Sequence, residues 1–132
     1  MRTRAWFGLA AGALLILSAA AHSLLGWPEL ARELAKLAPP EDLVLALAIG
    51  WHFGGVAMLT FGALVVQGFG RALRGRAADW RPVRVVGLAY VVFGAGALVA
   101  TGGRPFFLIF LMPGLLILAA ANDRRTAAAK GG

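Results

Sequence analysis

Residues 43–66 read LVLALAIGWHFGGVAMLTFGALVV and contain no Asp, Glu, Lys or Arg. A helix needs about 20 apolar residues to cross the hydrocarbon layer of a membrane, which is roughly 30 Å thick. Three further apolar stretches, at 6–25, 85–101 and 106–121, are also free of charged residues. The sequence therefore predicts an all-α membrane protein, in which residues 1–132 form a single domain with four transmembrane helices.

The overall composition agrees with a membrane location. Of the 132 residues, 60% are hydrophobic and 14% are charged, whereas an ordinary soluble domain has about 45–50% apolar and about 25% charged residues. The net charge is +7, but the cations cluster between apolar stretches, so we expect no nucleic-acid partner. The chain has no cysteine, which excludes disulfides and thiol catalysis.

The segment between the first two spans predicts a short amphipathic helix. It places Leu30, Leu34 and Leu37 on one helical face, and Arg32 and Lys36 on the opposite face. This pattern is typical of a helix that lies on the membrane surface with its apolar side toward the lipid. We therefore expect a separate surface helix between spans one and two.

The last two spans are expected to form an antiparallel hairpin. Only residues 102–105, with the sequence GGRP, separate them, and such a short connection keeps two helices side by side. Pro105 is suited to the first turn of a helix. Pro113, in the middle of the fourth span, removes a backbone hydrogen bond and predicts a kink there.

The distribution of Arg and Lys predicts the orientation. Ten of the 13 cations lie in the N-terminal segment, the second connection and the C-terminal tail, which share one side of a four-span topology. By the positive-inside rule this side is cytoplasmic, so both termini would face the cytoplasm of a plasma membrane, the inner membrane in a bacterium. The N-terminal stretch before His22 also resembles a signal peptide, but its apolar run continues to Trp27, which favours an uncleaved span.

Small residues indicate where the helices touch. In a bilayer, helices associate through close backbone contact at Gly, Ala and Ser, often spaced four apart. Gly8 with Gly12, and Gly50 with Gly54, have this spacing. These four glycines are therefore predicted helix-packing positions, and the second span, which has small residues on more than one face, is expected to be central.

Polar side chains inside a membrane span are costly and mark candidate functional positions. The candidates are Ser18, His22, Ser23, His52, Thr60, Gln67, Tyr90 and Thr101. We expect the hydroxyls of Ser and Thr to bond to a carbonyl of the preceding turn. Tyr90 is expected at the headgroup layer, which leaves the two histidines.

His22 and His52 are both expected to face the interior in the outer half of the bundle. Two imidazoles on facing helices are what axial ligation of a haem iron requires, as in haem b. Either histidine could instead bind a quinone carbonyl or relay a proton. The alternative is that both make hydrogen bonds between helices.

The expected function is that of a non-enzymatic membrane subunit or assembly factor, a scaffold that packs through glycine-rich faces. Its partners would be the lipid bilayer and either further copies of itself or a larger membrane complex. The alternative is an electron-transfer module that holds haem or a quinone between His22 and His52, and a small transporter is the third possibility. No span carries a carboxylate to titrate, which disfavours proton-coupled export.

Overall fold

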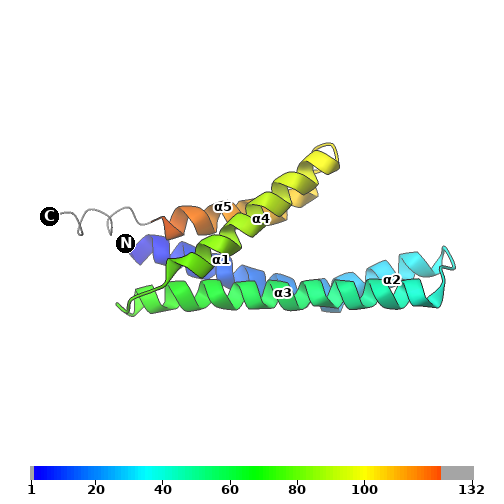
Figure 1. The fold of residues 1–132 in the computed structure, drawn as a ribbon, viewed down its shortest axis with the longest axis horizontal. Coiled ribbons are helices and arrows are strands. Elements are labelled where there is room, and N and C mark those ends of the chain that lie inside the picture. Colours follow the sequence, from blue (N-terminus) through cyan, green and yellow to red (C-terminus); the bar gives the residue numbers. More distant parts are fainter. Residues whose placement is uncertain (1, 123–132) are drawn as a thin grey trace.

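The structure is a computed structural model that describes residues 2–122, and these residues form helices and their connections without any strand (Figure 1). In chain order the elements are α1 (Arg2–Ala21), the π turn η1 (His22–Gly26), α2 (Trp27–Ala35), α3 (Glu41–Leu73), α4 (Trp80–Ala100), the 3-10 turn η2 (Pro105–Phe107) and α5 (Leu108–Ala121). The predicted all-α class is therefore confirmed.

Three helices of the described chain are long and apolar enough to cross a membrane. They are Arg2–Ala35, Glu41–Leu73 and Trp80–Ala100. The fourth expected span corresponds to Pro105–Ala121, which is a shorter apolar helix. Length and composition thus support membrane insertion of three helices, with a short fourth helix beside them.

The segment between the first two spans forms the predicted short amphipathic helix, α2. This helix continues the first one directly, so the expectation of a separate helix is wrong. α1, η1 and α2 follow one another as a single helix of 34 residues, because Gly26 and Trp27 keep right-handed helical backbone angles. Pro28 lacks an N–H and crowds the preceding turn, and the π turn just before it widens the helix, one of the ways in which membrane helices accommodate proline. The whole helix is about 51 Å long, which exceeds the roughly 30 Å hydrocarbon layer.

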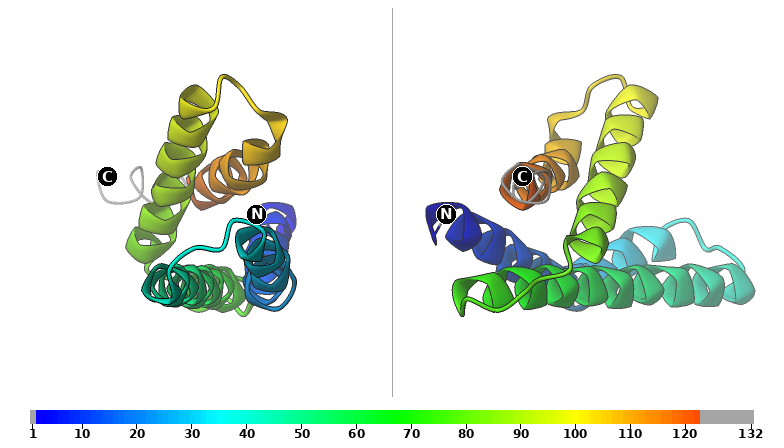
Figure 2. Two further views of the ribbon diagram at one scale, coloured as in Figure 1. Left: turned by 90° about the vertical axis from the view of Figure 1, so that its right-hand side faces the viewer. Right: turned by 60° about the vertical axis from the view of Figure 1, so that its left-hand side comes forward.

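Two helical hairpins make up the molecule. One pairs the long α1–α2 helix with α3, and the other pairs α4 with α5. The two hairpins meet near the start of α1 and the end of α3, and α4 then diverges from α3 (Figures 1 and 2). α1 packs against both α3 and α5, whereas α3 and α4 touch little, so the expectation that the second span is the central helix is wrong.

The core lies where the hairpins meet. Phe69, Leu15, Ile117, Val65, Val83 and Val86 are the largest side chains that are fully buried there. They come from α1, α3, α4 and α5, so all four helices share a core at this junction.

Glycines let α1 and α3 approach closely. A Cβ atom at Gly8 would overlap the ring of Phe69, and one at Gly12 would lie 2.9 Å from a methyl carbon of Val65. On α3, a Cβ at Gly62 would lie 3.0 Å from the carbonyl oxygen of Gly12. Gly50 differs, because a Cβ there would meet nothing within 4 Å. Gly50 therefore takes no part in packing within the described chain.

The α4–α5 hairpin forms as the short connection predicts. Gly102 and Gly103 have φ angles of 66° and 87°, a region that favours glycine, and Pro105 opens the turn that leads into α5. Pro113 lies inside α5 and is buried with Gly114. A Cβ at Gly114 would lie only 2.8 Å from the carbonyl oxygen of Gly87, so this glycine sets the close approach of the two helices.

Basic residues gather at one end of the molecule. The start of α1, the connection between α3 and α4, and the end of α5 all lie at that end (Figure 1). The start of α1 carries Arg2 and Arg4, and the connection with its flanking turns carries Arg71, Arg74, Arg76, Arg81 and Arg84. The remaining predicted tail cations, Arg124, Arg125 and Lys130, lie outside the described residues.

Candidate functional site

The polar site with the most interactions surrounds the π turn. π turns interrupt the regular hydrogen-bond ladder of a helix and are frequent at functional sites. Here the turn begins with His22 and Ser23, which are both half-buried, and ends at Gly26. Trp51 of α3 lies against this turn, and a Cβ at Gly26 would stand 2.9 Å from its ring. The site therefore joins the widened turn to the middle of α3.

His22 and Trp51 make two reciprocal hydrogen bonds. The Nε1–H of Trp51 donates to the carbonyl oxygen of His22 at 2.7 Å, and Nε2 of His22 lies 3.0 Å from the carbonyl oxygen of Trp51. Because a carbonyl oxygen can only accept, Nε2 carries the hydrogen in this bond. Each side chain thus bonds to the backbone of the other helix.

The same two rings also stack. Their centroids are 4.3 Å apart and their planes differ by 3°, which is parallel stacking at close range. A Cβ at Gly54 would lie 3.3 Å from Nε2 of His22, and one at Gly55 would overlap Oγ of Ser23. Glycine at these two positions therefore leaves space for the π turn. We call the bonded and stacked pair of His22 and Trp51 the His–Trp clasp.

His52 does not lie inside the bundle, so the expectation that it faces the interior is wrong. Its side chain is exposed, and its ring lies 5.8 Å from that of Trp27, at an angle of 56°. The buried face of α3 is centred near Gly62. At 100° per residue, Trp51 lies about 20° from that centre and His52 about 80°. The neighbouring tryptophan thus occupies the contact position that had been assigned to the histidine.

Trp51 is the functional residue that sequence reasoning missed. A tryptophan in the middle of an apolar span reads as one more hydrophobic residue, because nothing in the sequence shows that its N–H reaches another helix. The signal that was present is the Gly50–Trp51–His52–Phe53–Gly54–Gly55 run, in which two glycines follow the aromatic residues and open a space for a partner helix.

Two of the other polar candidates bond within their own helix. Thr60 donates to the carbonyl of Val56 at 2.9 Å, and Thr101 donates to that of Ala97 at 2.7 Å, which confirms the expected bonds for the two threonines. The described residues show no such bond for Ser18 or Ser23. Tyr90 is buried in the shared core and packs near Phe61, with the ring centroids 6.3 Å apart. Tyr90 therefore faces other helices of the chain, and its expected depth at the headgroup layer stays a prediction.

The side chains around the His–Trp clasp limit how a metal ion or a haem could bind there. Within residues 2–122 no group of three His, Cys, Asp or Glu side chains could hold a metal ion. Nε2 of His22 already bonds to the Trp51 carbonyl, so a haem iron at that atom would have to displace this bond. Nδ1 of His22 and the ring nitrogens of the exposed His52 remain as possible ligands.

Comparison with known proteins gives no further guide to function. No protein family model, no curated protein and no solved structure matches this chain. The function must therefore be inferred from the geometry of the chain itself.

Proposed function

We propose that the chain is a non-enzymatic membrane subunit or assembly factor, which associates with a second helical membrane chain. The observation that carries this proposal is the His–Trp clasp. His22, one of the two histidines that were candidates for ligand chemistry, bonds to and stacks against Trp51 of the facing helix. Its Nε2 and its backbone carbonyl thereby connect the π turn η1 to α3.

The face of α3 around Gly50 supports association with another chain. Ala46 and Gly50 are four residues apart and both exposed, and a Cβ at Gly50 would meet no atom within 4 Å. Exposed small residues at this spacing let a second helix approach closely. The partner would be a further copy of this chain or a helix of a larger membrane complex.

In this proposal the protein resides in the plasma membrane, the inner membrane in a bacterium, with both termini in the cytoplasm. The concentration of arginines at one end of the described molecule supports that orientation through the positive-inside rule. The short α5 would serve as the fourth span.

The substitution Gly50→Leu tests the association. A Cβ at this position would meet no atom within 4 Å, so we expect the monomer to accept leucine and fold normally, while a partner helix would be pushed away. We expect the fraction of assembled protein in mild detergent, measured by light scattering and cross-linking, to fall about tenfold, the change produced by about 1.4 kcal/mol. Gly96→Leu is the matched control, because Gly96 on α4 also has open space around it. Assembly that persists unchanged in Gly50→Leu would contradict the proposal.

The alternative function is the electron-transfer module. One observation favours it: the rings of Trp27, Trp51, His22 and His52 gather around the π turn, with centroid separations of 4.3 to 6.4 Å. If a haem or quinone binds there, His22→Ala and His52→Ala should both abolish its binding. If the chain is a subunit, neither substitution should remove a chromophore.

A further inference from the structure

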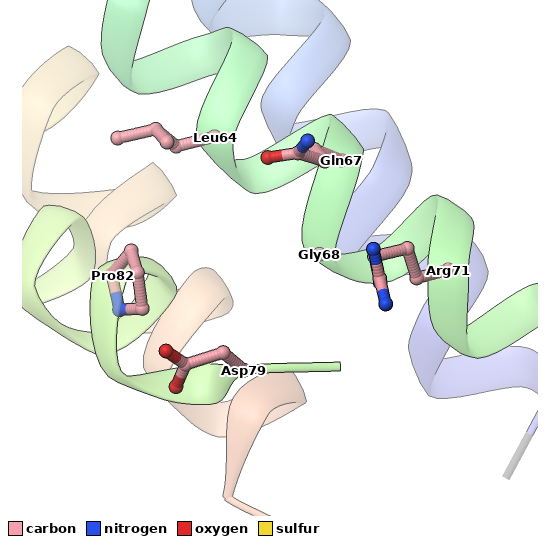
Figure 3. A pocket seen from close by; sticks show the side chains of 6 residues that line it. All are labelled: Leu64, Gln67, Gly68, Arg71, Asp79 and Pro82. Carbon is pink, nitrogen blue, oxygen red and sulfur yellow. The ribbon is translucent and has the colours of Figure 1, made fainter. Parts of the chain in front are cut away.

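A second polar site lies at the other end of α3, where the chain turns back into α4. It is a cavity of about 350 Å³ lined by Leu64, Gln67, Gly68, Arg71, Asp79 and Pro82 (Figure 3). The first four residues belong to α3 and Pro82 belongs to α4, while Asp79 caps the start of α4. The cavity is separate from the His–Trp clasp, and none of the roles described so far uses it.

The cavity has one positive and one negative side chain that do not pair with each other. Nε of Arg71 donates to the carbonyl of Ala77 at 2.9 Å, which ties the guanidinium to the connecting loop. The Asp79 carboxylate accepts the N–H of Arg81 at 3.0 Å, so it is fixed at the helix start. Among residues 2–122, the ion pairs within 4.0 Å are confined to α2 and Lys36 and include neither residue. Opposite charges are thus fixed on two sides of one cavity.

The position of the cavity along the helices matches the headgroup layer of a membrane. The apolar run of α3 ends at Val66, and Gln67 is the first polar residue after it. Half-buried Trp80 stands beside Asp79, and tryptophan is enriched at the membrane–water interface. Leu64 lies about two helical turns from Arg71 toward the apolar run. The cavity is therefore charged on the side nearest the α3–α4 connection and apolar on the side nearest the middle of α3.

The helices beyond the cavity leave apolar surface uncovered. α3 and α4 diverge from their connection toward the opposite end of the molecule (Figures 1 and 2). Phe53 of α3 and Phe93 of α4 lie about 20° around their helices from Leu64 and Pro82, and both are exposed. A molecule that filled the cavity with a polar headgroup would find apolar helix surface on both sides for its hydrocarbon chains.

We propose that this cavity binds one phospholipid with an aminoethyl phosphate headgroup, phosphatidylethanolamine. The phosphodiester accepts hydrogen bonds from Arg71 and Gln67, and the primary ammonium donates to the Asp79 carboxylate. The acyl chains run past Leu64 between α3 and α4. One cation and one anion in the cavity complement the one anion and one cation of this headgroup.

The charge pattern predicts selectivity among lipids. The quaternary ammonium of phosphatidylcholine has no N–H to donate to Asp79. An anionic headgroup such as that of phosphatidylglycerol brings no positive charge to the carboxylate. The exposed arginines of the neighbouring loop, Arg74 and Arg76, attract anionic lipids in general, but they do not line the cavity.

Native mass spectrometry of the purified full chain tests the proposal with the three lipids at matched acyl length. We expect one phosphatidylethanolamine to be retained about tenfold more than either other lipid, the change expected from one charge-assisted hydrogen bond. Arg71→Gln should lose about tenfold in retention of phosphatidylethanolamine. Arg76→Gln removes the same charge outside the cavity and should change nothing.

Asp79→Asn gives an independent test that does not depend on Arg71. Asparagine caps a helix as well as aspartate, so α4 should fold normally while the negative charge disappears. The preference for phosphatidylethanolamine over phosphatidylcholine should then vanish. Equal retention of all three lipids by the wild type, a preference for phosphatidylglycerol, or unchanged selectivity in Asp79→Asn would each overturn the proposal. Competition by soluble glycerophosphoethanolamine at the same concentration as the lipid would also overturn it, because the site would then not require acyl chains.

Discussion

At the scale of single residues, the hydrogen-bonded polar side chains within the apolar spans either connect two helices or bond to a carbonyl of their own helix. His22 was found from the sequence because an imidazole in an apolar span is unusual. Trp51 was not, because its role depends on a hydrogen bond to another helix. His52 was predicted to face the interior, but Leu59 and Ala63, which share its helical face, are both exposed.

The clasp predicts that the two histidines differ in their effect on stability. His22→Ala removes one hydrogen bond and the stack on Trp51, and should lower the free energy of unfolding by about 1–2 kcal/mol. His52→Ala removes an exposed ring and should change it by less than about 0.5 kcal/mol. Denaturant unfolding in detergent micelles measures both. Equal losses in the two variants would show that the clasp does not stabilise the helix pair.

Tyr90 provides a second prediction at this scale. Its hydroxyl is buried and has no hydrogen-bond partner in the described residues. An unsatisfied buried hydroxyl costs free energy, so Tyr90→Phe should leave stability unchanged or raise it by about 1 kcal/mol. Thermal unfolding followed by circular dichroism checks the sign. A loss of more than about 1 kcal/mol would indicate that the hydroxyl has a partner that stabilises the fold.

At the scale of helices, hydropathy predicts the positions of the elements more reliably than the connections between them. The apolar stretches and the antiparallel α4–α5 hairpin follow from length, composition and the GGRP connection. The continuation of α1 into α2 does not, because Trp27–Pro28 normally ends a helix, and only the π turn at His22–Gly26 allows the helix to continue. A local change of hydrogen-bond register leaves no pattern in the sequence.

Glycine substitutions test the close approach of α4 and α5. A Cβ at Gly114 would lie 2.8 Å from both the carbonyl oxygen of Gly87 and the backbone nitrogen of Val91. Gly114→Ala should therefore force the helices apart and lower the free energy of unfolding by about 1–3 kcal/mol. Gly96→Ala, with open space at its position, should be neutral or slightly stabilising, because alanine favours helix. Equal effects of the two variants in the same unfolding assay would contradict the close packing.

At the scale of the whole molecule, two hairpins that share one core leave much of the long α1–α3 pair without a partner from this chain. The sequence predicts the number of apolar segments and the basic end of the molecule. It does not predict the divergence of α3 and α4, because a crossing angle is set by which side chains meet, and both the exposed and the buried residues of these helices are largely apolar. That uncovered surface supports the proposed association with a second chain and the placement of a phospholipid beside α4.

The central claim is that the residues around the π turn hold helices together and do not hold a redox cofactor. The most direct test is the visible absorption spectrum of the protein, purified from its native membrane in mild detergent, before and after dithionite. We predict no haem band in either state. A sharp band that shifts on reduction and disappears in His22→Ala and His52→Ala would contradict the claim and establish electron transfer instead.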